Sequence, residues 1–164
     1  MHEQSPIEIF TVGHSNHSWA KFVALLQLAE IRVVIDVRTF PRSRFAHFCE
    51  THLRFELNDL GIAYIYFGRE LGGRGPLRTI SPADSNFRCI EYHSVLRQCA
   101  SFARDQRAVL MCSEHEPLDC HRFSPLADDL ASDGLSVRHI LRCGRIEDHS
   151  QTVIRRLNRN RSRK

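Results

Sequence analysis

The chain has 164 residues, 42 % of them hydrophobic, and this length fits one domain with a sizeable buried core. No apolar run approaches the roughly 18 residues that a membrane span needs, and the first residues lack the basic and apolar regions of a signal peptide. The six cysteines are scattered without a C-x-x-C pair, a pattern typical of free thiols in a reducing compartment. Composition therefore argues against a membrane protein and against a secreted disulfide framework, and it predicts a cytoplasmic protein.

Apolar runs typical of strands alternate along the chain with segments of helical periodicity. Strands are expected over 7–12, 33–37, 62–67, 108–112 and 135–141, and helices over about 19–29, 45–60, 87–102 and 121–132. Ser18 is the expected N-cap of the first helix, and Gly61 the residue that ends the second. The alternation predicts a three-layer α/β/α (Rossmann-like) domain with a mostly parallel five-stranded sheet. The segment 68–82 is expected to be a long loop of the kind that forms a lid, a binding loop or a disordered stretch.

The positive charge of the chain is concentrated at its C-terminus. Residues 155–164 hold six basic residues and no acidic one, so that the net charge of +4 becomes −2 without them. We expect residues 1–145 to form the single α/β domain, and residues 146–164 to form a helix that continues into a disordered basic tail. Such a tail could contact the phosphates of a nucleic acid.

The best candidate for a functional site is the stretch 108–122, A-V-L-M-C-S-E-H-E-P-L-D-C-H-R. A buried strand ends at Cys112, and in open parallel sheets ligands bind beyond the carboxyl ends of the strands. Asp119 stands where a helix N-cap would stand, so Cys120 would lie at a helix N-terminus that lowers the pKa of its thiol. Arg122 would lower that pKa further. Cys112 instead occupies the position of a strand-end nucleophile, and either thiol could be only a packed apolar side chain.

Two further polar clusters follow the first and second predicted strands. His14 and Ser15 form a strand-to-helix turn, where backbone N–H groups favour anions. Asp36 and Arg38 are two residues apart, so that the carboxylate could orient the guanidinium toward a phosphate, or could form a purely structural ion pair with it. Because the carboxyl ends of parallel strands share one edge, all three clusters are expected to form one site. The predicted substrate-binding residues are His14, Ser15, Asp36, Arg38, Ser43, Arg44 and Arg122, with Arg42 able to join them.

A zinc site is an alternative use of the same cysteines. Cys112, Cys120 and His121 could bind zinc if His14 or His115 completed the site. The C-x7-C-H spacing is not a usual zinc pattern, and an adjacent Cys and His seldom ligate one metal. We therefore predict no cofactor and keep zinc as the alternative.

Five motifs taken together resemble the domain of unknown function 488 family. They are T-V-G-H-S at 11–15, D-V-R-x-x-P-x-S-R at 36–44, L-G-I-x-Y at 60–64, L-G-G at 71–73 and C-S-E-x-x-P-x-x-C-H-R at 112–122. The resemblance extends over roughly 9–141 and implies a compact α/β domain in which the predicted site residues are motif positions. Cys49 stands where Asn is more usual, and the arginine-rich tail lies outside the pattern.

The leading interpretation is a small cytosolic enzyme of hydrolase or transferase type. Its substrate would be anionic, phosphate-bearing and nucleotide-like or derived from nucleic acid, held by Arg38, Arg44 and Arg122. The predicted catalytic residues are Cys112, Glu114, Cys120 and His121, with Glu114 as acid or base and a cysteine as nucleophile. One alternative is a nucleic-acid-binding accessory protein that uses the arginine tail, and another is a thiol redox or zinc protein.

Overall fold

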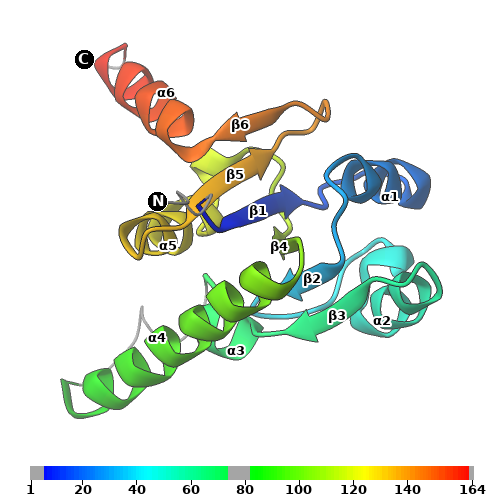
Figure 1. Ribbon diagram of the computed structural model, residues 1–164, viewed down its shortest axis with the longest axis horizontal. Helices are drawn as coiled ribbons and strands as arrows, with labels where there is room; N and C mark the ends of the chain where they lie inside the picture. The colour runs from blue at the N-terminus through cyan, green and yellow to red at the C-terminus, as the bar shows by residue number, and fades with distance from the viewer. Residues whose placement is uncertain (1–5, 74–81, 163–164) are drawn as a thin grey trace, which may run out of the picture.

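Six strands form one sheet in the order β3-β2-β4-β1-β5-β6 (Figure 1). They are β1 Glu8–Gly13, β2 Val33–Asp36, β3 Ala63–Tyr66, β4 Ala108–Cys112, β5 Ser136–Ile140 and β6 Ile146–Asp148. The computed structural model describes residues 6–73 and 82–162 of the chain. The five predicted strands pair in parallel, and β6 pairs antiparallel with β5. The predicted three-layer α/β/α class is confirmed, with six strands in place of five.

The helices cover both faces of this sheet. They are α1 Trp19–Leu28, α2 Glu50–Asp59, α3 Gly68–Leu71, α4 Pro82–Asp105, α5 Asp128–Ser132 and α6 His149–Arg161. Figure 1 shows α1 and α2 on one side of the strands and α4 and α5 on the other. Alternate residues of β4 follow the same division: Met111 packs with α1 and α2, whereas Leu110 and Cys112 pack with α4 and α5. The sheet therefore places the Cys112 side chain on the α4 and α5 face.

Local sequence signals fix the ends of several elements. Ser18 caps α1 by accepting a hydrogen bond of 3.3 Å from the backbone N–H of Lys21. Gly61 ends α2 with a φ of +70°, a left-handed conformation that glycine adopts without steric cost. The predicted long loop over 68–82 begins with the short helix α3, and residues 74–81 lie outside the described residues. No helix in the described ranges combines the length and apolar character needed to cross a membrane.

The C-terminal segment differs from the expectation of a disordered basic tail. Helix α6 is regular as far as Arg161, and Arg155 pairs with Glu147 at 2.8 Å and with Glu116 at 3.0 Å. Arg159 pairs with Asp119 at 2.7 Å. Residues 155–161 are ordered because these carboxylates offset their charge. Residues 146–148 belong to the sheet as β6, and α6 packs against β5, β6 and the short 3-10 turn η3 Pro117–Asp119.

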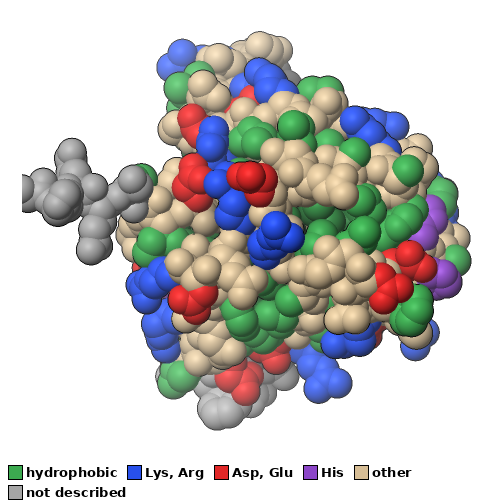
Figure 2. Space-filling model, turned by 45° about the vertical axis from the view of Figure 1, so that its right-hand side comes forward, with side chains coloured by type: hydrophobic (Ala, Val, Ile, Leu, Met, Phe, Trp, Pro, Cys, Tyr) green, Lys and Arg blue, Asp and Glu red, His purple; other side chains and the backbone are tan. Residues whose placement is uncertain are grey.

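Arginines outside α6 also form ion pairs with nearby carboxylates. Arg138 pairs with Glu8 and Asp148 at 3.1 Å each, and Arg107 pairs with Glu8 at 3.5 Å. Figure 2 shows acidic and basic side chains interspersed on the face that it presents. The excess of arginine therefore supplies ion pairs across the surface as well as positive charge.

Candidate functional site

The loops that follow β1, β2 and β4 are joined to one another by hydrogen bonds. The backbone N–H of His14 donates to the carbonyl of Cys112 at 2.9 Å, and that of Ser15 donates to Ser113 at 2.9 Å. The Arg38 guanidinium from the β2 loop donates to His14 Nε2 at 3.2 Å. The predicted convergence of the three polar clusters is confirmed. Gly13 allows this approach, because a Cβ at that position would lie 1.7 Å from the carbonyl oxygen of Glu114.

Asp36 and Arg38 form a buried, bidentate ion pair. Arg38 Nε donates to Asp36 Oδ1 at 2.9 Å, and Arg38 Nη2 donates to Oδ2 at 2.6 Å. Arg38 Nη1 donates to the carbonyl of Phe48 at 2.8 Å, and the hydroxyl of Tyr64 donates to Asp36 Oδ2 at 2.6 Å. Burial and the charge of Asp36 raise the pKa of Tyr64, so that this hydroxyl keeps its proton. These contacts favour a structural role for the pair, although Arg38 still lines the cavity described below.

His14 is held neutral between the loops. Burial first, and then the charge of Arg38, lower the pKa of His14 to about 4. Because Arg38 can only donate, Nε2 of His14 accepts, and Nδ1 donates to the carbonyl of Ser15 at 2.9 Å. Both ring nitrogens are therefore engaged within the protein.

The helix expected from about residue 121 is interrupted near its start. The segment η4, Arg122–Ala127, contains Ser124 in an extended conformation with φ −136° and ψ 121°, and regular helix begins only with α5 at Asp128. Pro125 explains the interruption, since a proline disfavours helical dihedrals in the residue before it and lacks an N–H. Cys120 is itself extended and follows a short 3-10 turn, η3 Pro117–Asp119. The expectation that a helix N-terminus activates Cys120 is thus wrong, and so is the expectation that Asp119 is the cap.

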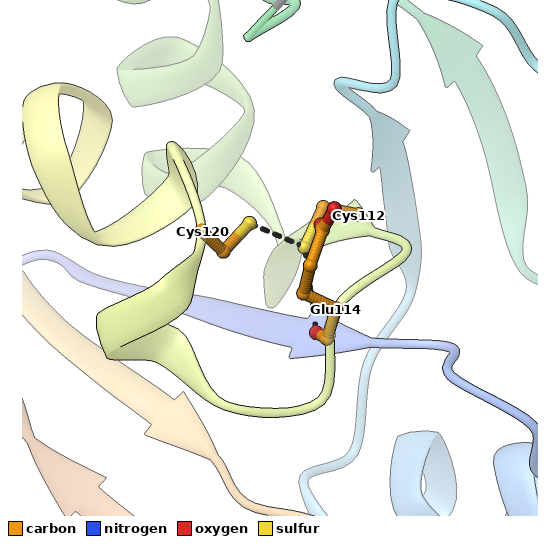
Figure 3. Close-up of side chains that lie close together, drawn as sticks. All are labelled: Cys112, Glu114 and Cys120. Carbon is orange, nitrogen blue, oxygen red and sulfur yellow. Dashed lines mark hydrogen bonds between the residues drawn. The ribbon is translucent and has the colours of Figure 1, made fainter.

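The two cysteines of this loop form a thiol pair, with a Cys112 Sγ–Cys120 Sγ distance of 2.8 Å (Figure 3). Cys112 is 0 % exposed and Cys120 is 9 % exposed. The hydrogen bond with Cys112, followed by burial, raises the pKa of Cys120, and the charge of Arg122 opposes this shift. Cys120 is therefore a protonated thiol at neutral pH.

Cys120 also lines a cavity of about 720 Å³ at the sheet edge. Arg42, Glu114, His121 and Tyr92 contribute to the same wall. Arg42 is exposed and has no ion-pair or hydrogen-bond partner among the residues that the structure describes. Tyr92, on α4, could not be anticipated from the sequence, because its helical spacing indicates only a core position. Cys120 is thus the member of the thiol pair that a molecule in the cavity would meet.

His121 is oriented toward Cys120 by a backbone contact. His121 Nε2 lies 3.0 Å from the carbonyl of Val37, so Nε2 carries the proton and Nδ1 accepts. This Nδ1 lies 3.7 Å from Cys120 Sγ. Burial lowers the pKa of His121, which keeps the imidazole neutral and able to accept a proton. Gly73 packs directly on the ring, since a Cβ there would be 2.7 Å from His121 Cγ.

Glu114 lies beside the thiol pair. One of its carboxylate oxygens and the two sulfur atoms all lie within 4.8 Å of one another (Figure 3). Burial would raise the pKa of Glu114, but hydrogen bonds from its own backbone N–H and from both thiols outweigh burial and lower the pKa. The carboxylate is therefore ionised at neutral pH.

Arg122 is a buried cation with incomplete hydrogen bonding. The residue is 0 % exposed, and Nη2 donates to the carbonyl of His115 at 2.7 Å. Nε and Nη1 have no hydrogen-bond partner among the described residues. The charge of Arg122 opposes the rise in the pKa of Cys120, and the backbone N–H of Arg122 lies 3.4 Å from Cys120 Sγ. No carboxylate among the described residues forms an ion pair with this guanidinium, so its charge favours a thiolate at Cys120.

Three other predicted residues lie near the site without joining it. The Ser43 hydroxyl accepts from the backbone N–H of Phe45 at 3.1 Å, and Arg44 is exposed with its guanidinium 4.9 Å from the centre of the Phe45 ring. The Ser15 hydroxyl donates to Asn16 at 3.3 Å. The groups that could take part in a reaction are the two thiols, the Glu114 carboxylate, the His121 imidazole and the Arg122 guanidinium.

Comparison with known proteins identifies one family. A protein-family model described as Domain of unknown function DUF488 matches residues 18–126, from the N-cap of α1 into η4. The matched range contains the Asp36–Arg38 pair and the whole thiol loop, but not the turn after β1 or helix α6. No curated protein and no solved structure matches the chain.

Proposed function

This chain belongs to the DUF488 family, and because the family description names no activity, we propose a function from the geometry of the site. The protein is a thiol–disulfide exchange enzyme in which Cys120 attacks the substrate and Cys112 resolves the product. The observation that carries this proposal is the 2.8 Å contact between two sulfurs of which only Cys120 lines the cavity. Such a dithiol would operate in the reducing cytoplasm, where its free cysteines suit the compartment.

The exchange proceeds in two balanced steps. In the first, the deprotonated sulfur of Cys120 attacks one sulfur of a substrate disulfide, a mixed disulfide forms, and a substrate thiolate leaves. In the second, the sulfur of Cys112 attacks Cys120, the mixed disulfide breaks, and a second substrate thiolate leaves. The two protons of the cysteines pass to the two leaving thiolates, and the Cys112–Cys120 pair has lost two electrons. A second thiol compound or dithiol protein must then reduce the pair.

The neighbours of Cys120 support the first step. The pKa of Cys120 is raised chiefly by its hydrogen bond to Cys112, so attack requires an acceptor for its proton. Nδ1 of His121 is such an acceptor at 3.7 Å, and the buried charge of Arg122 favours the thiolate that results. A substrate sulfur that enters the cavity can reach Cys120, which lines it, but not Cys112, which does not.

A hydrolase or transferase that acts on an anionic substrate is the second candidate. Arg42 favours it, because it lines the cavity, has no partner within the described part of the chain, and offers a planar donor pair to a phosphate or carboxylate. In that reaction one thiol would suffice as nucleophile, whereas exchange requires a second sulfur in contact with the first. Arg42 fits the exchange reaction equally well if the substrate disulfide carries carboxylates.

Trapping of the mixed disulfide tests the proposal. We expect wild type treated with a small carboxylate-bearing disulfide to lose the two thiols of this site and to retain no adduct there. The Cys112→Ser variant should instead retain one stable adduct on Cys120, and Cys120→Ser should retain none at Cys112, because Cys112 is inaccessible.

A matched control comes from another buried cysteine. Burial raises the pKa of Cys99 to about 12, so Cys99→Ser should leave both results unchanged. The partly or fully exposed Cys49, Cys89 and Cys143 are replaced by serine in every sample. Wild type that accumulates an adduct on Cys120 without forming the internal disulfide would contradict the exchange mechanism.

A further inference from the structure

The reduced thiol pair is part of a donor set that suits a metal ion. Cys112 Sγ, Cys120 Sγ and a Glu114 carboxylate oxygen lie within 4.8 Å of one another, and Figure 3 shows the three side chains together. From them we propose that the reduced protein binds a divalent cation of the zinc type. Thiolate and carboxylate are both common zinc ligands, with bonds of about 2.3 Å and about 2.0–2.2 Å.

The spacing of the donors is compatible with tetrahedral coordination. Bonds of these lengths place neighbouring ligand atoms about 3.5–3.8 Å apart. The sulfur atoms, now 2.8 Å apart, would need to separate by about 1 Å, which side-chain rotation of Cys120 at the cavity wall can provide.

His121 lies beside the three donors and would complete the coordination only after its side chain moves, since its ring nitrogens are not within 4.8 Å of all of them. Its Nδ1 is unprotonated and lies 3.7 Å from Cys120 Sγ, which is the separation of two atoms bound to one metal. Its Nε2 donates to the carbonyl of Val37, and metal-binding histidines usually donate their second N–H in this way. His14, which the sequence offered for this position, is engaged at both nitrogens by Arg38 and Ser15. Glu114 and His121, and not His14, are therefore the ligands that we assign beside the two cysteines.

The electrostatic balance of the site is compatible with a bound cation. Two thiolates, one carboxylate and a divalent cation together carry one negative charge, and the metal-free site with Glu114 ionised and both thiols protonated carries the same charge. Arg122, whose backbone N–H lies 3.4 Å from Cys120 Sγ, is 0 % exposed and has two nitrogen atoms without hydrogen-bond partners among the described residues. Two protons leave as the cation binds, so the net charge that faces this buried guanidinium stays the same.

This inference deepens the proposed function, because the same two sulfurs cannot bind the cation and form a disulfide at once. The bound cation would hold Cys112 and Cys120 as thiolates and block their exchange with a substrate. Transfer of two electrons from the thiolates to a substrate disulfide yields the Cys112–Cys120 disulfide and two substrate thiolates, and the cation loses two ligands. The site is therefore a dithiol whose reactivity the cation controls.

Titration with Co²⁺ tests the inference on the full chain, reduced and freed of metal with a chelator. We expect one Co²⁺ per chain, with the near-ultraviolet thiolate-to-cobalt absorption and intense visible bands of tetrahedral coordination, and displacement by Zn²⁺. Glu114→Gln and His121→Gln should each weaken binding by about tenfold or more, whereas Cys99→Ser and Asp59→Asn should not. Zn²⁺ should also raise the Tm of wild type and not that of Cys120→Ser.

The outcomes separate this inference from the proposed function. Reduced wild type that shows neither the thiolate-to-cobalt absorption nor a Zn²⁺-dependent rise in Tm would overturn the metal site, even if the internal disulfide still forms. Glu114→Gln tests the two claims in one protein, since it should bind Co²⁺ poorly yet still close the Cys112–Cys120 disulfide. Equal Co²⁺ affinity in wild type and Glu114→Gln would overturn the assigned ligand set.

Discussion

Replacement of Arg38 by methionine should destabilise the protein strongly, because it removes half of a buried ion pair. The guanidinium is 3 % exposed and the carboxylate of Asp36 is 0 % exposed, and they share hydrogen bonds of 2.9 and 2.6 Å. Without Arg38, the donors to Asp36 that remain among the described residues are the Tyr64 hydroxyl and the backbone N–H at position 38. Breaking a buried pair from one side costs about 3–5 kcal/mol.

Urea unfolding of reduced protein measures this cost. Arg38→Met should lower the free energy of unfolding by about 3–5 kcal/mol, which for a domain of this size corresponds to a fall in Tm of about 6–20 °C. The double variant Asp36→Asn/Arg38→Met should recover part of the loss, because it no longer buries an unpaired charge. The exposed pair Arg54–Glu50, at 3.0 Å, is the matched control.

The control variant Arg54→Met should lose at most about 0.5 kcal/mol, since exposed pairs on one helix contribute little. A loss below about 1 kcal/mol for Arg38→Met would refute the reasoning. Weaker substrate binding at unchanged stability would then indicate that Arg38 holds an anion, as the sequence alone allowed.

Three further predictions address the C-terminal helix, the buried histidines and the buried cation. Truncation after Ile154 removes Arg155 from the buried Glu147 and should lower the free energy of unfolding by about 1–3 kcal/mol in urea; an unchanged value would mean that α6 does not stabilise the fold. Burial lowers the pKa of His139 to about 3, so the unfolded chain binds the extra proton between about pH 6.5 and 3. Stability should therefore fall as the pH drops below about 6.5, and equal values at pH 7 and pH 5 would argue against a neutral buried His139. Arg122→Met should change the stability of the metal-free protein by less than about 1 kcal/mol but weaken Co²⁺ binding, and a loss like that of Arg38→Met would show that Arg122 is already paired.

Regular features of the fold could be predicted from the sequence. The five parallel strands are apolar runs separated by helical periodicity, and Ser18 and Gly61 mark helix ends by their own chemistry. Strand β6 could not be predicted in this way, because it has three residues and a single apolar side chain. It forms by pairing with β5, which is a tertiary contact.

The composition of the site could be predicted, but not the roles of its residues. Parallel strands bring their carboxyl ends to one edge, so the convergence of 13–15, 36–44 and 112–122 follows from topology. Whether Arg38 binds Asp36 or a ligand depends on the Phe48 carbonyl and on the burial of the pair, which are tertiary properties. The contact between Cys112 and Cys120 likewise depends on how the intervening loop turns, and in the sequence only Pro117, which begins the η3 turn, marks that loop.

The exchange reaction is tested directly by the intact mass of the Cys112→Ser and wild-type proteins after exposure to a carboxylate-bearing disulfide. We expect one adduct on Cys120 in the variant, and in wild type the loss of two hydrogen atoms with no adduct. An adduct that persists on Cys120 in wild type, or a Cys120 that fails to react in either protein, would contradict a Cys112–Cys120 exchange centre.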